Sequence, residues 1–251
     1  MPPSNVLVFG RRKAEILPAI VELGLRCVEE NPDVVISYGG DGTLLGAERQ
    51  WPGVPKVALR DSRRCHVCSH ESNETILRHL VENTLKRTEF IKLRATVGDC
   101  ELTCLNDIIL HKMNINAGVR YSVWIDDEHY GHDEIVGDGL VVATPFGSAA
   151  YYRSITHSTL RVGIGLAFNN TIEPINHLVL SEDSAIRVLI TRGPAQMAVD
   201  NNPGVIPVDR GDQISIRRAD HNAVILAYDW VRYPADQFIF HQTRAEAEAD
   251  D

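Results

Sequence analysis

The spacing of apolar residues changes near residue 92, and this change constrains the fold more than any other feature of the sequence. Before it, short apolar runs at 5–9, 34–36 and 56–59 alternate with segments of helical periodicity at 11–23 and 72–86. After it, short alternating runs follow one another, separated by turn-forming residues. Strands that alternate with helices predict a parallel sheet, whereas successive short strands predict stacked antiparallel sheets.

We therefore predict an α/β N-terminal domain with a parallel sheet at 1–92 and a β-rich, sandwich-like C-terminal domain at 93–230. The expected strands of the second domain are 93–97, 101–110, 119–125, 140–143, 178–180, 187–190, 213–217 and 224–228. The last segment, 231–251, ends in the charged run RAEAEADD. We expect its end to be solvated, and the segment as a whole could pack back on the first domain.

Composition and charge exclude several classes of function. The net charge is −9, from 25 basic and 34 acidic side chains, so a nucleic-acid partner is not expected. No apolar run reaches the roughly 18 residues that a membrane-spanning helix needs. The first residues also lack the long apolar stretch of a secretory signal. We therefore expect a cytoplasmic protein without a membrane partner.

The cysteines raise the question of a metal site. Four of the five cysteines lie in two pairs, Cys65 with Cys68 and Cys100 with Cys104. A zinc ion bound by four thiolates is conceivable, but the second pair has the wrong spacing and lies in a predicted strand. We predict buried or idle thiols and no metal ion held directly by the protein.

The stretch SYGGDGTLLGAER joins a short apolar run to a predicted helix that begins at Thr43. Its turn, Gly39-Gly40-Asp41-Gly42, would place backbone N–H groups at a helix N-terminus, a geometry that favours phosphate. A tight strand-to-helix turn without a ligand is the alternative. An acid beside a phosphate is useful if it accepts a proton from an attacking hydroxyl group or helps to hold Mg²⁺.

A second stretch, GDGLVVATPFGSAAYYRS at 137–154, has a similar organisation. An acid–glycine turn leads into an apolar strand, and Thr144-Pro145 ends that strand. Small residues then open a predicted helix that carries Tyr151 and Tyr152. This would be another place for an anionic or ribose group, although a strand-to-helix connection in a core would look much the same.

Taken together, GGDGT near residue 40, Asn106-Asp107 within a predicted strand and DGLVVATPxGSxAY near residue 140 resemble the NAD kinase family in order and spacing. The resemblance extends over about 6–228. It implies an α/β domain followed by a β-rich domain, with the active site between them. It also implies transfer of a phosphoryl group from ATP or polyphosphate to the 2′-hydroxyl of the adenosine ribose of NAD or NADH.

The resemblance also implies roles for particular residues. Asp41 matches the acid that accepts the proton of the acceptor hydroxyl, and the adjoining residues Gly39, Gly40, Gly42 and Thr43 match the turn that faces the phosphates. The NAD-binding residues implied in the same way are Asn106, Asp107, Asp138, Ser148, Ala149, Ala150 and Tyr151. Tyr151 would pack on adenine, and Asp138 would act near the nicotinamide half across a subunit interface.

Several positions depart from the family pattern. Asp107 stands where glutamate is usual, Phe146 replaces a hydroxyl residue and Ala149 replaces threonine. The stretch LRDSRRCHVC lacks the usual Gly-x-x-Gly-Phe, and the late Asp-Gly is Asp200-Asn201. These changes affect positions that bind the acceptor nucleotide, whereas the turn implied in phosphoryl transfer matches the family pattern. Arg60, or the arginines at 63 and 64, could supply a substitute phosphate contact.

The resemblance implies Mg²⁺ with ATP as cofactor, NAD as substrate and a homodimer or homotetramer. Two alternatives stay open. One is a non-catalytic relative that binds NAD or another nucleotide. The other is a lipid kinase of the diacylglycerol or sphingosine type, which shares GGDGT but lacks the second stretch.

Overall fold

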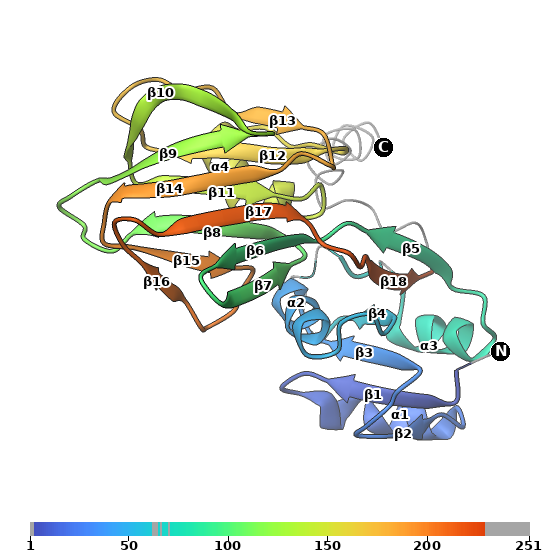
Figure 1. Cartoon of the computed structure of the whole chain (residues 1–251). Coiled ribbons are helices and arrows are strands. Elements are labelled where there is room, and N and C mark those ends of the chain that lie inside the picture. The colour runs from blue at the N-terminus through green and yellow to red at the C-terminus, as the bar shows by residue number, and fades with distance from the viewer. Residues whose placement is uncertain (1–2, 62–64, 66, 70, 229–251) are drawn as a thin grey trace, which may run out of the picture. The chain divides into compact units, whose positions relative to one another are not determined.

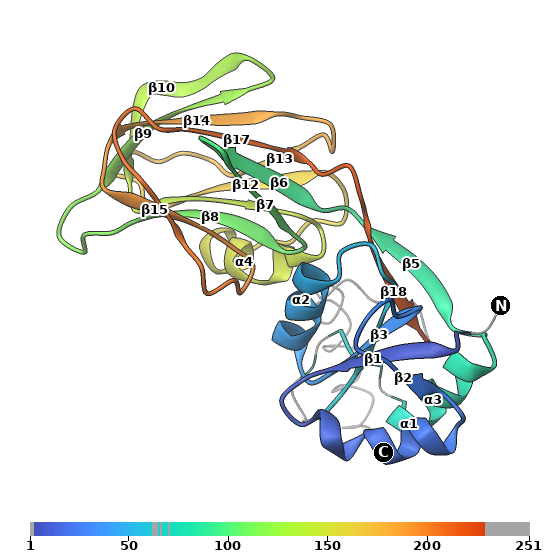
Figure 2. The ribbon, with the colours of Figure 1, turned by 60° about the horizontal axis from the view of Figure 1, so that its bottom comes forward.

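The computed structural model describes residues 3–61, 65, 67–69 and 71–228, and Figures 1 and 2 show its ribbon from two sides. Contacts between residues divide the chain into two compact units. The first comprises 1–90 with 221–251, and the second comprises 91–220. Each unit has its own sheets and core, so each is described by itself.

The first unit is built on a six-stranded sheet in the order β2-β1-β3-β4-β18-β5. Neighbouring strands are parallel except at the β18–β5 edge. The strands are β1 (Asn5–Phe9), β2 (Arg26–Cys27), β3 (Val34–Tyr38), β4 (Lys56–Leu59), β5 (Lys86–Phe90) and β18 (Ala223–Ala227). The predicted parallel sheet is confirmed.

Helices cover both faces of this sheet. Helices α1 (Leu17–Glu22) and α3 (Asn73–Val81) pack on one face, where Ile20 and Leu77 join apolar side chains of β1, β3 and β4. Helix α2 (Asp41–Gln50) packs on the other face through Ala47. Burial on both faces of the sheet explains why the strands β1, β3 and β4 are almost continuously apolar.

Two predicted helices differ in extent from the observed ones. The segment 11–23 forms a short 3₁₀ turn, η1 (Lys13–Glu15), before α1 begins. The segment 72–86 is helical only to Val81, because β5 already starts at Lys86. The predicted cap is confirmed: the Ser72 hydroxyl accepts the N–H of Thr75 at 3.0 Å.

The second unit contains two antiparallel six-stranded sheets. The order in one is β10-β9-β14-β17-β6-β7, with β6 (Leu93–Val97), β7 (Cys100–Cys104), β9 (Val119–Ile125), β10 (Glu128–Gly137), β14 (Ile186–Arg192) and β17 (Gln213–Arg218). The order in the other is β13-β12-β11-β8-β15-β16, with β8 (Asp107–Lys112), β11 (Gly139–Ala143), β12 (Ile164–Asn169), β13 (Leu178–Leu180), β15 (Ala195–Val199) and β16 (Ile206–Val208).

These two sheets share one apolar core. Buried residues of both, for example Tyr121 and Val188 from one and Leu140 and Met197 from the other, belong to a single cluster. The layers are visible in Figure 1. The outer face of the second sheet carries η2 (Gly147–Ala149) and α4 (Tyr151–Thr156), anchored by the fully buried Tyr152. The predicted β-rich, sandwich-like architecture is confirmed.

Two predicted strands are placed differently in the structure. The segment 101–110 is not one strand, because the chain leaves β7 in one sheet at Cys104 and enters β8 in the other at Asp107. The last strand, expected at 224–228 in the β-rich part, is β18 and pairs with β4 and β5 of the first unit. The segment 231–251 lies outside the described residues. No helix in the described part of the chain is long and apolar enough to cross a membrane.

Candidate functional site

The glycine turn of the first unit lies where β3 ends and α2 begins. Gly40 is the N-cap of α2 in an extended conformation, and Asp41 is the first helical residue. A Cβ atom on Gly39 would lie 2.1 Å from the Thr43 hydroxyl oxygen, so only glycine fits there without a rearrangement. The turn therefore brings bare backbone to the N-terminus of a ten-residue helix, where the helix dipole favours an anion.

The side chain of Asp41 is held by the segment that follows β4. One carboxylate oxygen of Asp41 accepts the N–H of Val67 at 3.1 Å. Cys65 and Cys68 form a disulfide on either side of this contact, and the Cys68 sulfur lies 3.8 Å from the Gly39 carbonyl oxygen. The expectation of idle thiols was therefore wrong for this pair.

The remaining cysteines do not form a cluster. Cys27 and Cys100 are exposed and Cys104 is buried, all three with free thiols. In the described part of the chain, no three His, Cys, Asp or Glu side chains are arranged to hold a metal ion. Whether the protein holds a metal ion directly stays a prediction.

Arg60 follows β4 and is fixed by its surroundings. Asn73 bridges its backbone, accepting the Arg60 N–H at 3.1 Å and donating to the Arg60 carbonyl at 2.8 Å. The guanidinium donates to the Ser69 carbonyl at 2.9 Å, while the buried Nε has no hydrogen-bond partner among the described residues. Arg60 thus retains an unused donor. The arginines at 63 and 64 lie outside the described residues.

In the second unit, Asn106 and Asp107 lie at the break between β7 and β8. The carboxylate of Asp200 accepts three consecutive backbone N–H groups there: Leu105 at 2.9 Å, Asn106 at 2.7 Å and Asp107 at 3.3 Å. The Asp200 N–H in turn donates to the Asp107 carbonyl at 3.0 Å. The sequence alone marked Asp200 only as a departure from a family pattern, and the turn-forming run DNNPG was the available signal. In the structure Asp200 adopts a left-handed φ of +46°.

Asp107 and Asp200 form a buried pair of carboxyl groups. Burial, and then the nearby Asp200 carboxylate, raise the pKa of Asp107 from 3.8 to about 7, although the backbone N–H of Tyr151 opposes the shift. Burial also raises the pKa of Asp200, and its three N–H partners only partly oppose this. At neutral pH the Asp107 carboxyl group is therefore partly protonated and can act as a hydrogen-bond donor as well as an acceptor.

The turn at 144–150 packs directly against this break. The Thr144 hydroxyl donates to the Leu105 carbonyl at 2.6 Å and accepts the Gly147 N–H at 3.1 Å. A Cβ atom on Gly147 would lie 2.2 Å from the Asn106 carbonyl oxygen, so the close approach requires glycine. These contacts bring Asn106 and the small residues of η2 together.

The other residues of this turn differ in their exposure. Ser148 is fully buried, and its hydroxyl lies within 3.2 Å of the Pro145 and Leu160 backbones. Phe146 is 4% exposed, so its ring belongs to the interior. Ala149 is half-buried and Ala150 is exposed. NAD binding by Ser148, Ala149 and Ala150 stays a prediction, and the hydrogen bonds give Ser148 a structural task.

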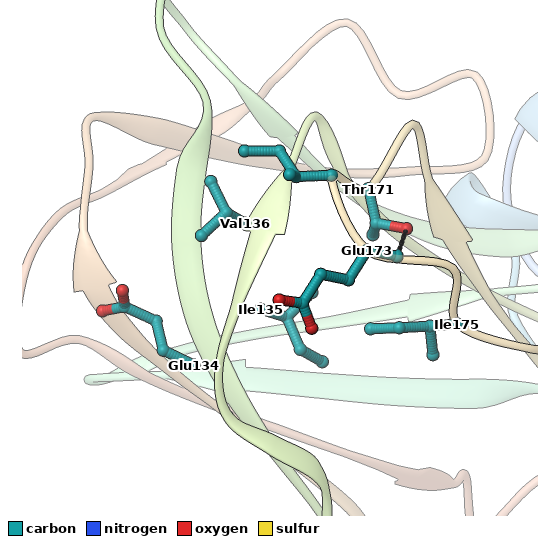
Figure 3. Close-up of a pocket in the computed structure, with 7 residues that line it drawn as sticks. Glu134, Ile135, Val136, Thr171, Glu173 and Ile175 are labelled. Atoms are coloured by element: carbon teal, nitrogen blue, oxygen red, sulfur yellow. Dashed lines mark hydrogen bonds between the residues drawn. The ribbon is translucent and has the colours of Figure 1, made fainter.

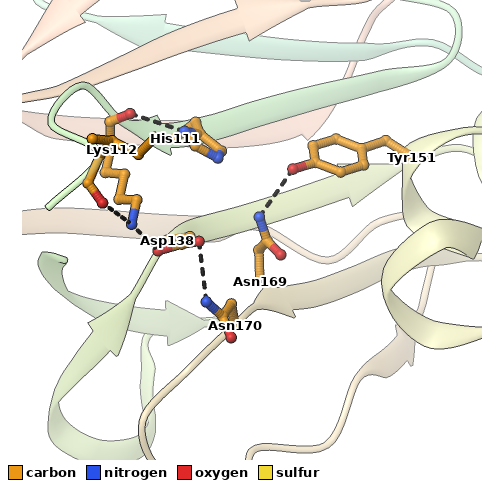
Figure 4. A network of polar contacts seen from close by, with 7 residues as sticks. His111, Lys112, Asp138, Tyr151, Asn169 and Asn170 are labelled. Carbon is orange, nitrogen blue, oxygen red and sulfur yellow. Dashed lines mark hydrogen bonds and ion pairs between the residues drawn. The ribbon is translucent and has the colours of Figure 1, made fainter. Parts of the chain in front are cut away.

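Tyr151, at the start of α4, and Asp138, between β10 and β11, make polar contacts with the end of β12 and the residue after it (Figure 4). The Asn169 amide donates to the Tyr151 hydroxyl at 2.9 Å. Asp138 pairs with Lys112 at 2.6 Å and accepts the Asn170 amide at 3.2 Å. The Lys112 hydrogen bond, followed by the Asn170 hydrogen bond, lowers the pKa of Asp138. The half-buried Tyr151 thus presents a fixed ring, and Asp138 is a charge-neutralised carboxylate.

A small pocket beside this network contains none of the predicted site residues. Glu134, Ile135, Val136, Thr171, Ile172, Glu173 and Ile175 line it (Figure 3). Its aliphatic walls and two carboxylates suit an anionic dinucleotide poorly.

Most of the chain is similar to NAD and NADH kinases. No protein-family model matches the sequence. The chain is 28% identical over 217 residues to the NAD kinase of Gemmatimonas aurantiaca, covering 80% of this chain and 74% of that protein. Yeast NADH kinase, solved with NADH, has a TM-score of 0.81 and 20% identity, covering 96% of this chain and 89% of its own. An NAD kinase from Archaeoglobus fulgidus, solved with ATP, has a TM-score of 0.75 and 21% identity, covering 94% and 96%. The two solved structures share the fold of this chain.

Proposed function

We propose that the chain is a member of the NAD kinase family and that it transfers a phosphoryl group from ATP to the 2′-hydroxyl of the adenosine ribose of NAD or NADH. Polyphosphate is the alternative donor. The observation that carries this proposal is Asp41, an acid at the first position of α2 inside a glycine turn at the carboxyl end of a parallel sheet. A carboxylate in the first turn of a helix also stabilises that helix, and Asp41 bonds the Val67 N–H. At a phosphate-binding turn the same carboxylate can in addition accept a proton from an acceptor hydroxyl group.

Asp41 accepts the proton as the ribose oxygen attacks the γ-phosphorus of the donor. The new P–O bond forms while the bond to the leaving phosphate breaks, and that bond's electron pair goes to the leaving oxygen. The N-terminus of α2 and the turn Gly39-Gly40 stabilise the phosphate charge. Arg60 has a buried, unused donor close in sequence to the Asp41-binding segment, which supports a contact to the same charge.

Mg²⁺ accompanies ATP in this proposal and neutralises charge on the phosphate oxygens. The described residues include no three-ligand cluster, and Asp41 is the one carboxylate of the turn. The ion would therefore be held mainly by the phosphates, with Asp41 as the residue able to contact it.

The second unit binds the adenosine of NAD through the Asn106–Asp107 break and Tyr151. The Asn106 amide has no hydrogen-bond partner within the described part of the chain, so it is available to a ligand. Asp138 would contact the nicotinamide half of a dinucleotide bound mainly to a second copy of the chain.

We further propose that the protein is at least a homodimer. Three large apolar side chains stand out near the network of Asp138: Met113 is 53%, Ile115 93% and Ile172 77% exposed. They belong to loops attached to that network, because Lys112 donates to the Ile115 carbonyl and Asn170 donates to Asp138. Burial of such residues against a second copy would stabilise an interface.

Replacement of Asp41 by asparagine tests the proposal. The variant should keep its fold and NAD binding, but the rate of NADP formation should fall by about two to four orders of magnitude, the usual contribution of a positioned base. Asp33→Asn is the matched control, since Asp33 also accepts backbone N–H groups, from Ser4 and Asn5, away from the turn. A near-normal rate for Asp41→Asn would remove Asp41 from the mechanism.

A further inference from the structure

We infer that Asp200 is a positioning residue for the dinucleotide, acting by holding the Asn106–Asp107 break in its binding conformation. This inference rests on the proposed function. Asp200 need not touch the ligand. Its carboxylate is directed at the backbone of the segment 105–107, which includes Asn106 and Asp107, the two residues assigned to adenosine.

The hydrogen bonds explain why the break depends on one side chain. The chain passes from one sheet to the other between Cys104 and Asp107, so the N–H groups of 105–107 cannot all be satisfied by a strand ladder. Buried N–H groups without a partner are costly, and Asp200 supplies the acceptor for three in succession. The Asp200 N–H returns a hydrogen bond to Asp107, which closes the connection from the other side.

The backbone around Asp200 is built for this contact. Asp200 follows β15, which pairs with β8 up to Val199 and Ile108. Its left-handed conformation, with φ of +46°, turns the chain out of β15 at the level of the break. Aspartate, asparagine and glycine tolerate this conformation better than other residues do, so substitutions among them isolate the carboxylate.

The consequence for binding follows from the free amide of Asn106. The half-buried Asn106 amide, which has no partner in the described part of the chain, binds a ligand more tightly if its backbone is fixed beforehand, because less conformational entropy is then lost on binding. Thr144 fixes the segment at the Leu105 carbonyl, and Asp200 fixes it at three N–H groups. Loss of Asp200 should therefore weaken NAD binding while leaving the phosphoryl-transfer step largely intact.

The alternative is that Asp200 is only a structural cap whose loss destabilises the unit without affecting the ligand. Asp126 provides a matched control for this alternative. It is also a left-handed aspartate of the second unit, with φ of +50°, and its carboxylate accepts the Ala185 N–H at 2.8 Å and the Ser184 hydroxyl at 2.9 Å. Asp126 lies in the β9–β10 turn, and its carboxylate is bonded to the segment 184–185 instead of to 105–107.

The experiment compares steady-state kinetics of wild type, Asp200→Asn, Asp200→Gly and Asp126→Asn. Asparagine keeps one acceptor oxygen but places an NH₂ group against a backbone donor, and glycine removes the acceptor altogether. We expect the KM for NAD to rise about tenfold in Asp200→Asn and further in Asp200→Gly, with kcat at saturating NAD and the KM for ATP within about threefold of wild type. Asp126→Asn should leave all three constants unchanged.

The inference is overturned if folded Asp200→Asn has the wild-type KM for NAD. It is also overturned if kcat and both KM values change together, because that pattern indicates general damage. If wild type forms no NADP and binds no NAD in calorimetry, the proposed function fails, and the inference fails with it. If wild type is active and the Asp200 variants keep the wild-type KM for NAD, the inference alone fails.

A measurement on wild type covers the case in which the Asp200 variants do not fold. Amide hydrogen exchange of 105–107 should already be slow without NAD, because Asp200 holds these N–H groups in the free protein. Fast exchange without NAD that becomes slow on NAD addition would show that the ligand, and not Asp200, orders the break.

Discussion

Replacement of Asp107 by asparagine probes the buried carboxyl pair beneath the β7–β8 break. The pKa of Asp107 rises from 3.8 to about 7 through burial and the nearby Asp200 carboxylate. The folded protein therefore binds this proton more tightly than the unfolded chain does. Its contribution to stability is fully present below pH 3.8 and is lost as the pH rises toward 7. Asparagine has nearly the same shape and does not titrate, so it removes this pH dependence.

The size of the effect follows from the shift. The gap between the two pKa values is about three pH units, and each unit corresponds to about 1.4 kcal/mol. The free energy of unfolding of wild type, relative to Asp107→Asn, should fall by about 4 kcal/mol over the whole window and by about 3 kcal/mol between pH 5 and pH 8. Above pH 8 the difference should be constant.

Urea unfolding of both proteins at four pH values between 5 and 8, followed by circular dichroism and tryptophan fluorescence, measures this difference. At pH 5 the free energy of unfolding of wild type should be highest relative to that of the variant. As the pH rises, the free energy of unfolding of the variant should increase steadily relative to that of wild type. A difference that does not depend on pH, or that changes in favour of wild type as the pH rises, would refute the raised pKa of Asp107 and the buried pair behind it.

Other predictions concern the neighbouring residues. Lys112 and Asn170 lower the pKa of Asp138, so wild type should lose stability relative to Asp138→Asn as the pH falls below about 4. This pH dependence has the opposite sign to that of Asp107, and urea unfolding between pH 3 and 6 measures it. Ala149→Thr adds a hydroxyl group at a half-buried position and should lower the KM for NAD with little change in kcat. Phe146→Thr removes a buried ring, so it should lower the free energy of unfolding by about 3 kcal/mol in thermal or urea unfolding without lowering the KM for NAD. Light scattering should find at least a dimer, and a monomer that is active at nanomolar concentration would contradict the proposed role of Asp138.

Local signals in the sequence predicted much of the first unit. The run ending at Ile36, the glycine turn and the helix after it appear as β3, the turn and α2, because glycine and the helix start are short-range effects. Ser72 predicted a helix cap for the same reason. The two-part fold class followed from periodicity alone.

Contacts between distant residues could not be predicted in this way. The segment 101–110 has the polar pair Asn106-Asp107 in its middle, but this pair does not by itself show that the chain changes from one sheet to the other there. The acceptor that makes this break possible, Asp200, lies 94 residues from Asn106. The pairing of β18 with β4 and β5 likewise depends on tertiary structure, and so does the position of the Cys65–Cys68 disulfide beside Asp41.

Phosphorylation of NAD is tested most directly by following the γ-phosphate of the donor. Wild-type protein is incubated with Mg²⁺, NAD and ATP carrying radioactive phosphorus in its γ-phosphate, with polyphosphate and NADH in parallel reactions. The proposal predicts that label moves into a product that an NADP-specific dehydrogenase accepts. Label that stays in ATP while NAD binds would indicate a non-catalytic relative, and label that moves instead into added diacylglycerol or sphingosine would indicate a lipid kinase. Either result would contradict the proposed function.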